Sequence, residues 1–302
     1  MDILQRLLSL LKQPSAYPKK KALVIEGGGM RGIFLVGVLQ AFSDRGYFPW
    51  KAIIGSSAGA LVGVAYAARQ IHLARDAFFT ELLTGKLIRL LNVLKPEKHI
   101  LNLDWMVDTI INGNDPLDIH RLKKSCPVLI TATDVIPGTP LKTIYLNSKK
   151  DEISTALKAT AAIPFLYRNF VPYKEYRLLD GALLSPIPYL KALSMGFKEK
   201  DILTVLTRQK GYRKKEESFW IKTLYESYYR DEEHRLLLET LDNRYLKYNQ
   251  VLDDLENKHT GIDIIYPPED FKVNRLTVNE KKILTGFEQG ISAGRQFLTG
   301  KA

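Results

Sequence analysis

Two short apolar runs, each followed by a glycine-containing turn and then a helical stretch, constrain the fold most strongly. Residues 21–26 lead directly into Gly27-Gly28-Gly29-Met30-Arg31-Gly32, and a helix is expected over 33–42. Residues 52–55 lead into Gly55-Ser56-Ser57-Ala58-Gly59, after which small apolar residues continue. Two consecutive strand–turn–helix units favour a mostly parallel sheet with helices on both faces. The expected fold class is therefore α/β.

Later segments supply further strands and helices for the same sheet. Residues 71–125 have a mostly helical pattern, and a dense group of leucines within them argues against a solvated face. The final helix is expected over 277–298. The expected strands are 127–134, 143–146, 201–207 and 261–266. The dense apolar residues are Leu82, Leu83, Leu87, Ile88, Leu90 and Leu91.

The composition changes between residues 216 and 258, where long charged and tyrosine-containing helices are expected. This stretch lacks the strands of a second α/β core, and the strand after it is expected to rejoin the first sheet. We therefore predict one domain over 19–302, with 216–258 as a helical insertion. Residues 1–18 are predicted as an amphipathic helix that ends before Pro14 and either docks on its own protein or lies on a membrane.

Charge and cysteine content limit the partners and the compartment. The formal net charge is +11, which favours anionic partners, but the basic residues are scattered and do not specifically indicate nucleic acid. The single cysteine, Cys126, excludes an internal disulfide and a cysteine-rich metal site. We expect a cytoplasmic protein, soluble or in peripheral contact with the inner, anionic membrane surface. No cofactor, no metal and no particular oligomeric state is expected.

The second glycine turn carries a candidate nucleophile. Gly55-x-Ser57-x-Gly59 fits the pattern in which a serine occupies a sharp turn between a strand and a helix. Glycines flank such a serine because side chains would clash where the strand and the helix pass close together. The competing interpretation is an ordinary strand–helix connection.

The first glycine turn has two chemical interpretations. Gly27-Gly28-Gly29-Met30-Arg31-Gly32 matches G-x-G-x-x-G between a strand and a helix, which is the dinucleotide-binding pattern. However, the next strand ends in Gly55-Ser56-Ser57 and not in the acidic residue that would hold a ribose. Beside a nucleophilic serine, the loop N–H groups would instead stabilise an oxyanion. Arg31 would then lie near that oxyanion or anchor the loop.

A serine nucleophile needs a base, and the sequence offers no attractive histidine. The two histidines in the later part of the chain, His234 and His259, occur in polar surroundings that indicate surface positions. Asp180-Gly181-Ala182 instead places a carboxylate at the end of an apolar segment. With Ser57 and the glycine loop, this indicates a Ser–Asp dyad in which Asp180 accepts the serine proton.

Three motifs in this order resemble the patatin-like phospholipase family: Gly-Gly-Gly-x-Arg-Gly at 27–32, Gly-x-Ser-x-Gly at 55–59 and Asp-Gly-Ala at 180–182. The small-residue run that ends in Ala162-Ile163-Pro164 is also similar. The resemblance covers about residues 20 to 210, and it implies a three-layer α/β/α sandwich. It further implies Ser57 as the nucleophile, Asp180 as the base and Gly27, Gly28 and Gly29 as the oxyanion hole, with Arg31 supporting it.

The sequence therefore predicts a serine esterase that hydrolyses lipid or other acyl esters, with the apolar helices of 71–111 lining an acyl pocket. An acyltransferase that uses the same dyad remains a second possibility. A catalytically silent protein that binds lipid or a partner is a third, and a dinucleotide-binding enzyme ranks last. The lipid class and the cleaved position do not follow from the resemblance.

Overall fold

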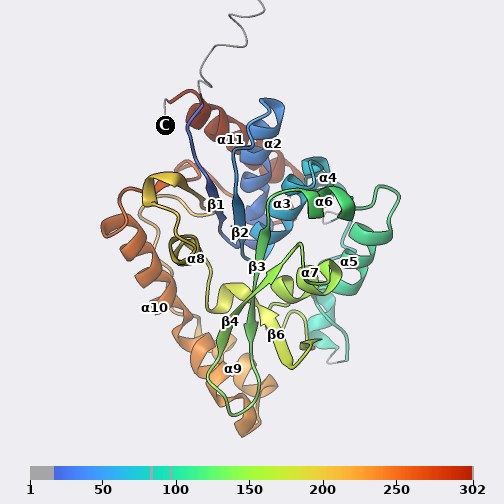
Figure 1. Cartoon of the computed structure of the whole chain (residues 1–302). Coiled ribbons are helices and arrows are strands. Elements are labelled where there is room, and N and C mark those ends of the chain that lie inside the picture. The colour runs from blue at the N-terminus through green and yellow to red at the C-terminus, as the bar shows by residue number, and fades with distance from the viewer. Residues whose placement is uncertain (1–16, 82–83, 96, 301–302) are drawn as a thin grey trace, which may run out of the picture.

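The computed structural model describes residues 17–81, 84–95 and 97–300 (Figure 1). The predicted N-terminal helix, together with Leu82 and Leu83, therefore lies outside the described residues. In the described chain, eight strands form one mixed sheet. They are β1 (Ala22–Ile25), β2 (Ala52–Gly55), β3 (Val128–Asp134), β4 (Lys142–Asn147), β5 (Val171–Tyr173), β6 (Tyr176–Asp180), β7 (Ile202–Val205) and β8 (Asp263–Ile265).

The strand order is β5-β6-β3-β2-β1-β7-β8, and β4 pairs with β3. The strands from β3 through β2, β1 and β7 to β8 are parallel to one another. The β4, β5 and β6 strands form the antiparallel end of the sheet. Strand β8, which follows the long helical segment, pairs with β7 and completes the parallel end.

Helices cover both faces of this sheet, as expected for a three-layer α/β/α sandwich. Their bounds are α2 (Gly32–Asp44), α3 (Ala58–Ala67), α4 (Ile71–Asp76), α5 (Leu103–Asn112), α6 (Ile119–Lys124), α7 (Ile153–Ala161), α8 (Tyr189–Ser194), α9 (Phe219–Tyr228), α10 (Arg235–Asn257) and α11 (Glu280–Leu298). Alternate residues of the central strands supply the two cores because successive side chains in a strand point to opposite faces.

The two cores can be followed from β1. Leu23 and Ile25 belong to the larger core, which also contains buried residues of α2, α3, α7 and α11. Ala22 and Val24 belong to the smaller core, with buried residues of α8 and of the C-terminal half of α10. Figure 1 shows α8 and α10 on the side of the sheet away from α3 and α7. The predicted fold class is thus confirmed.

The expectation of mostly helical structure over 71–125 is only partly correct. Between α4 and α5 the described chain contains only a short π-helix (Ala77–Glu81), a short 3-10 helix (Leu90–Leu94), turns and a single bridge between Ile88 and Leu101. Leu87 and Ile88 are buried as expected, but Leu91 is 81% exposed. The apolar residues are dense here because an irregular segment lines a cavity, a role that helical periodicity does not reveal. No helix among the described residues is long and apolar enough to cross a bilayer.

Candidate active site

The site lies where two strands approach each other along one edge of β3. Strand β2 runs parallel to β3 and places Gly55 opposite Ile130. Strand β6 runs antiparallel and places Asp180 opposite Ala132. Because β4 pairs with β3 over both of these positions, β2 and β6 must share the other edge. Their carboxyl ends therefore meet opposite Thr131, which brings two distant parts of the chain together.

Ser57 occupies a strained turn directly after β2. Its φ of 50° and ψ of −128° lie in a region that non-glycine residues rarely adopt. The turn is tightly enclosed, since a Cβ on Gly55 would lie 2.7 Å from the Cα of Ala60, and one on Gly59 would lie 2.4 Å from the Glu26 carbonyl oxygen. Gly55 and Gly59 therefore permit this strand–helix approach, as the predicted nucleophile turn requires.

Two hydrogen bonds fix Ser57. Its hydroxyl Oγ donates to Asp180 Oδ2 at 2.8 Å. Its backbone N–H donates to Thr160 Oγ1 at 2.9 Å. Thr160 lies near the end of α7, within the small-residue run noted in the sequence, but nothing in its local pattern predicted this contact. The structure thus brings Ser57 and Asp180 together although 123 positions separate them.

Asp180 is buried, with 4% of its surface exposed, and both carboxylate oxygens have partners. Oδ1 accepts a hydrogen bond from the Ala182 amide at 2.7 Å, while Oδ2 faces Ser57. Burial raises the pKa of Asp180 to about 6, although these hydrogen bonds and the nearby Arg275 and Arg244 oppose the rise. At neutral pH the group is therefore mostly a carboxylate, and its pKa is close enough to neutrality for a general base.

Gly181 allows this close approach of β6 to β3. A Cβ on Gly181 would lie 2.1 Å from Thr131 Oγ1 and 2.5 Å from the Thr131 carbonyl carbon. Any side chain here would push Asp180 away from the edge of β3, and hence away from Ser57. This close packing against Thr131 explains why glycine follows Asp180 in the Asp-Gly-Ala motif.

The glycine loop presents unpaired N–H groups beside the serine. Within the described chain, the amides of Gly28, Gly29 and Ala58 donate to no protein acceptor. The amide of Gly27, by contrast, donates to the Pro186 carbonyl at 3.2 Å, and that of Met30 donates to the Arg275 carbonyl at 3.0 Å. Gly29 has a φ of +56°, a conformation that favours glycine.

Ala58 was not among the predicted oxyanion-hole residues. It follows Ser57 at the first position of α3, where a helix leaves its N–H groups without intrahelical acceptors. The serine-turn pattern contains this signal, because the residue after the nucleophile commonly supplies one oxyanion N–H.

Arg31 lies beneath the loop rather than in the cavities that reach Ser57. Only 4% of its surface is exposed, and its Nε lies 3.5 Å from Thr207 Oγ1. Burial and the neighbouring Arg208 and Arg275 lower the pKa of Arg31 to about 10, so it stays charged at neutral pH. Its position matches the loop-anchor alternative of the sequence analysis.

A buried carboxylate beneath the same loop links it to the C-terminal helices. Glu26 is fully buried; its Oε2 accepts a hydrogen bond from the Thr207 amide, and its Oε1 accepts one from the Tyr248 hydroxyl at 2.7 Å. Tyr248 belongs to α10. The predicted helical insertion thus contacts the residue that precedes the glycine loop, and it is part of the support of the site.

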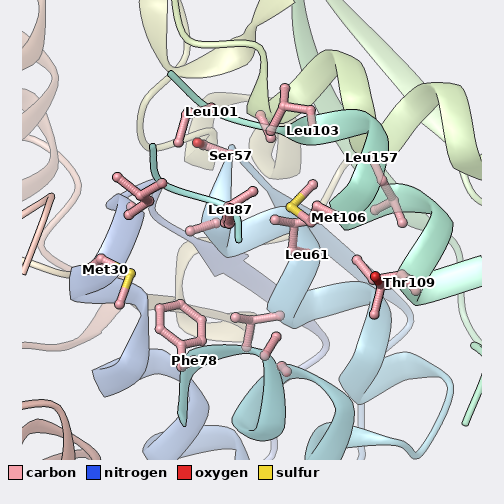
Figure 2. Close-up of a pocket in the computed structure, with 18 of the residues that line it drawn as sticks. Met30, Ser57, Leu61, Phe78, Leu87, Leu101, Leu103, Met106, Thr109 and Leu157 are labelled. Carbon is pink, nitrogen blue, oxygen red and sulfur yellow. The ribbon is translucent and has the colours of Figure 1, made fainter. Parts of the chain in front are cut away.

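Two cavities meet at Ser57. The first has a volume of about 150 Å³ and an almost wholly apolar lining (Figure 2). Its walls come from α3, α5, α7 and the segment between α4 and α5. The part of the wall that lies within 71–111 was predicted to line a pocket. Labelled examples in Figure 2 are Leu61, Phe78, Leu87, Met106 and Leu157. The second cavity is smaller, with a lining that is part polar and part apolar, and it contains Asp180.

No histidine lines either cavity in the described part of the chain. His259 Nδ1 lies 2.8 Å from Glu199 Oε1, on the far side of the sheet with Tyr189 of α8. His234 is half-buried and stacks on Phe170, so its prediction as a solvated residue is wrong. The aromatic partner comes from a segment 64 positions earlier, which local sequence could not reveal. In the described chain, no cluster of three or more metal-ligating side chains is present.

Known proteins resemble this chain over both its halves. A family model described as "Patatin-like phospholipase" matches residues 23–193, and one described as "Domain of unknown function (DUF6363)" matches residues 234–300. The uncharacterized protein YjjU of Escherichia coli is 26% identical over 290 residues, which cover 93% of this chain and 78% of that protein. This similarity therefore extends through the C-terminal helices.

Other relatives match a shorter part. An uncharacterized NTE family protein of Mycobacterium tuberculosis is 33% identical over 170 residues, covering 55% of this chain and 44% of that protein. The triacylglycerol lipase ptl3 of Schizosaccharomyces pombe is 50% identical over 204 residues, covering 56% and 41%. The chain thus spans less than half the length of these two proteins.

Among solved structures, VipD of Legionella pneumophila shares the fold with a TM-score of 0.50 at 12% identity, over 94% of this chain and 67% of VipD. The family model covers more than half of the chain, and it includes the glycine loop, Ser57 and Asp180. This protein therefore belongs to the patatin-like phospholipase family.

Proposed function

We propose that this protein is a lipid acyl-ester hydrolase that uses Ser57 and Asp180 as a catalytic dyad. The observation that carries the proposal is the 2.8 Å hydrogen bond from Ser57 Oγ to Asp180 Oδ2, next to three amides without protein acceptors. Family membership and the relatives named as triacylglycerol lipases support a lipid ester as the substrate.

In the first step, Ser57 Oγ attacks the ester carbonyl carbon while its proton passes to Asp180 Oδ2. The amides of Gly28, Gly29 and Ala58 donate to the oxyanion of the tetrahedral intermediate. The intermediate collapses as the carbon–oxygen bond to the alcohol breaks, and the alcohol leaves with the proton from Asp180. In the second step, water attacks the acyl-enzyme with Asp180 again as the base, which releases the acid and restores Ser57.

We assign the other predicted loop residues to positioning. The Gly27 amide is already bound to the Pro186 carbonyl, and Arg31 contacts Thr207 under the loop. The Gly27 amide therefore ties the loop to Pro186, while Arg31 fixes the loop from below and adds positive potential. Neither group donates to the oxyanion in this proposal.

The apolar cavity would accept the acyl chain, because Ser57 and Ala58 lie in its wall together with side chains of α3, α5 and α7. Burial of each methylene of an acyl chain contributes about 0.8 kcal/mol, so an apolar cavity of this kind favours long-chain esters.

Contact with a membrane surface would deliver such substrates. Phe219 and Trp220 begin α9 with 74% and 79% of their surfaces exposed. Aromatic rings of this kind insert well at the boundary between lipid headgroups and acyl chains. We assign this end of the molecule, shown at the bottom of Figure 1, as the membrane-contacting surface.

The proposal is tested with a fluorophosphonate probe and a p-nitrophenyl ester. We expect covalent labelling of the wild type at Ser57 and loss of both labelling and turnover in Ser57→Ala. Ser194→Ala is the matched control, since Ser194 lies exposed at the end of α8. Full activity of Ser57→Ala, or labelling at another residue, would contradict the assignment.

A further inference from the structure

The smaller cavity on the other side of Ser57 carries three basic side chains. Lys214 follows β7, Arg244 lies on α10, and Arg275 lies between β8 and α11. The cavity measures about 40 Å³ and also includes Ser57 and Asp180. All three cations come from the C-terminal third of the chain, outside the part that matches the patatin-like family model.

These basic groups have few hydrogen-bond acceptors among the described residues. Arg244 donates from Nε to Glu217 Oε1 at 3.1 Å, and Lys214 Nζ lies 3.8 Å from the same oxygen. The Arg275 side chain makes no hydrogen bond or ion pair within the described chain, and the nearby Asp180 already accepts hydrogen bonds from Ser57 and Ala182. A ligand with several anionic oxygens would supply the acceptors that the Arg275 guanidinium lacks.

The protonation of Lys214 depends on what the cavity holds. Burial, together with Arg244, Arg275 and Arg31, lowers the pKa of Lys214 to about 6, while Glu217 opposes the shift. Near neutral pH the Lys214 amine is therefore mostly uncharged, and an anion bound beside it would favour its protonated form.

The position of the cavity tells which part of a substrate enters it. The apolar and the cationic cavities share only four lining residues, Gly29, Ser57, Ile163 and Arg275. An ester carbonyl at Ser57 with its acyl chain in the apolar cavity would direct its alcohol part toward the cations. Guanidinium groups bind phosphate oxygens in bidentate geometry, which two arginines in one small cavity can supply.

We propose that Lys214, Arg244 and Arg275 form a subsite for a phosphate group on the alcohol part of the ester, so that the enzyme prefers acyl glycerol phosphates to neutral glycerides. This inference rests on the proposed function, because the acyl chain and the reacting ester fix the orientation. In this proposal the C-terminal segment recognises the phosphate on the alcohol part, and the residues at the strand ends of the sheet cleave the ester.

The kinetic test compares 1-oleoylglycerol 3-phosphate with 1-oleoylglycerol in the same detergent micelles at pH 7.5. A hydrogen bond to a charged group contributes about 1.5–3 kcal/mol, so the wild type should favour the phosphate ester by roughly tenfold or more in kcat/KM. Arg275→Gln should lose that preference while still cleaving the neutral ester, and Arg275→Lys should retain part of it. Arg235→Gln on α10 is the matched control, since its side chain is 77% exposed.

A binding test does not depend on turnover. We expect Ser57→Ala to bind glycerol 3-phosphate but not glycerol in calorimetry, and to lose that binding when combined with Arg275→Gln. Lys214→Met provides a second disruption if the melting curve shows that Arg275→Gln fails to fold.

The outcomes separate the two proposals. Equal turnover of both esters and no binding of glycerol 3-phosphate would overturn the subsite while Ser57-dependent hydrolysis still stood. Equal loss of activity on both esters in Arg275→Gln would mean that Arg275 supports Ser57 and Asp180, and it would overturn its role in selecting the phosphate ester. Inorganic phosphate binding as tightly as glycerol 3-phosphate, without an ester preference, would make this a free-phosphate site. Absence of any Ser57-dependent hydrolysis would overturn the proposed function, and the subsite's orientation with it, whatever the calorimetry showed.

Discussion

The sheet and the C-terminal segment contribute to the site in different ways. Between β1 and β6, backbone geometry does most of the placement: two strand ends meet on β3, and glycines stand where a Cβ would lie only 2.1–2.8 Å from neighbouring atoms. From Lys214 to Arg275, long charged side chains reach the same point from separate elements. Under the two proposals, the backbone of the sheet places the reacting groups, whereas the side chains of the C-terminal segment select the substrate. The two regions should therefore fail differently when mutated.

The largest effect is expected for Asp180→Asn, which keeps the shape of the base but removes its proton affinity. General-base catalysis contributes about 10²- to 10⁴-fold, so kcat should fall by that order for every ester. Asp253→Asn, an exposed change on α10, is the control. If the loss depended on the substrate headgroup, the division between the two regions would be wrong.

Asp180→Asn should also stabilise the fold at neutral pH. The folded-state pKa of about 6 lies above the ordinary 3.8, so the cost of the charged carboxylate to stability develops as the pH rises from about 3.8 and is complete above about 6. The cost is bounded at about 3 kcal/mol, from roughly 1.4 kcal/mol per pKa unit. The melting temperature of Asp180→Asn should exceed that of the wild type at pH 8, with a smaller difference at pH 4. This result would mean that the buried Asp180 carboxylate lowers the stability of the wild type. Destabilisation at pH 8 would indicate a structural role instead.

The apolar cavity can be shortened without touching the dyad. Leu61→Trp adds bulk where the side chain of α3 enters the cavity (Figure 2). We expect kcat/KM for a C16 ester to fall by about tenfold or more while a C4 ester is little affected, because each lost methylene contact matters in such a pocket. Leu190→Trp on α8, where Leu190 is 55% exposed, is the control. Equal losses for both chain lengths would contradict an acyl site.

The pH dependence can show how far the C-terminal region influences the dyad. Asp180 must be ionised to accept the serine proton, so kcat/KM should fall as the pH drops below about 6. Arg275 lowers the pKa of Asp180, and Arg275→Gln should therefore shift this acid limb to higher pH. The profile is measured with a neutral short-chain ester. An unchanged limb would mean that the two regions act independently.

The smallest effect is expected at the membrane-contacting surface. Trp220→Ser should weaken sedimentation with anionic phosphatidylglycerol vesicles by roughly fivefold, since part of one aromatic side chain no longer inserts. Leu284→Ser on α11, where Leu284 is 47% exposed, is the control for general loss of apolar surface. Equal effects of both changes would contradict the assignment of α9 as the membrane-contacting surface.

The contrast between the regions also explains what could be predicted from sequence. Ser57, Asp180 and the glycine loop carry their signal locally, because a strained turn or a close backbone approach requires particular residues within a few positions. Thr160, Tyr248 and Arg275 reach the site as single side chains, and no local pattern marks these particular residues. The same holds for the irregular chain around Leu87, whose apolar residues face a cavity that exists only after folding.

The meeting of β2 and β6 on one edge of β3 has a consequence for how the chain becomes active. Ser57 and Asp180 lie 123 positions apart and can hydrogen-bond only after β2 and β6 have both paired with β3, and Tyr248 reaches Glu26 across 222 positions. Closing such long loops costs entropy that local helices do not pay, so these contacts form late in folding. An unfinished or truncated chain would then carry the nucleophile without its base. Recovery of esterase activity during refolding would report completion of the sheet, not the formation of its first helices.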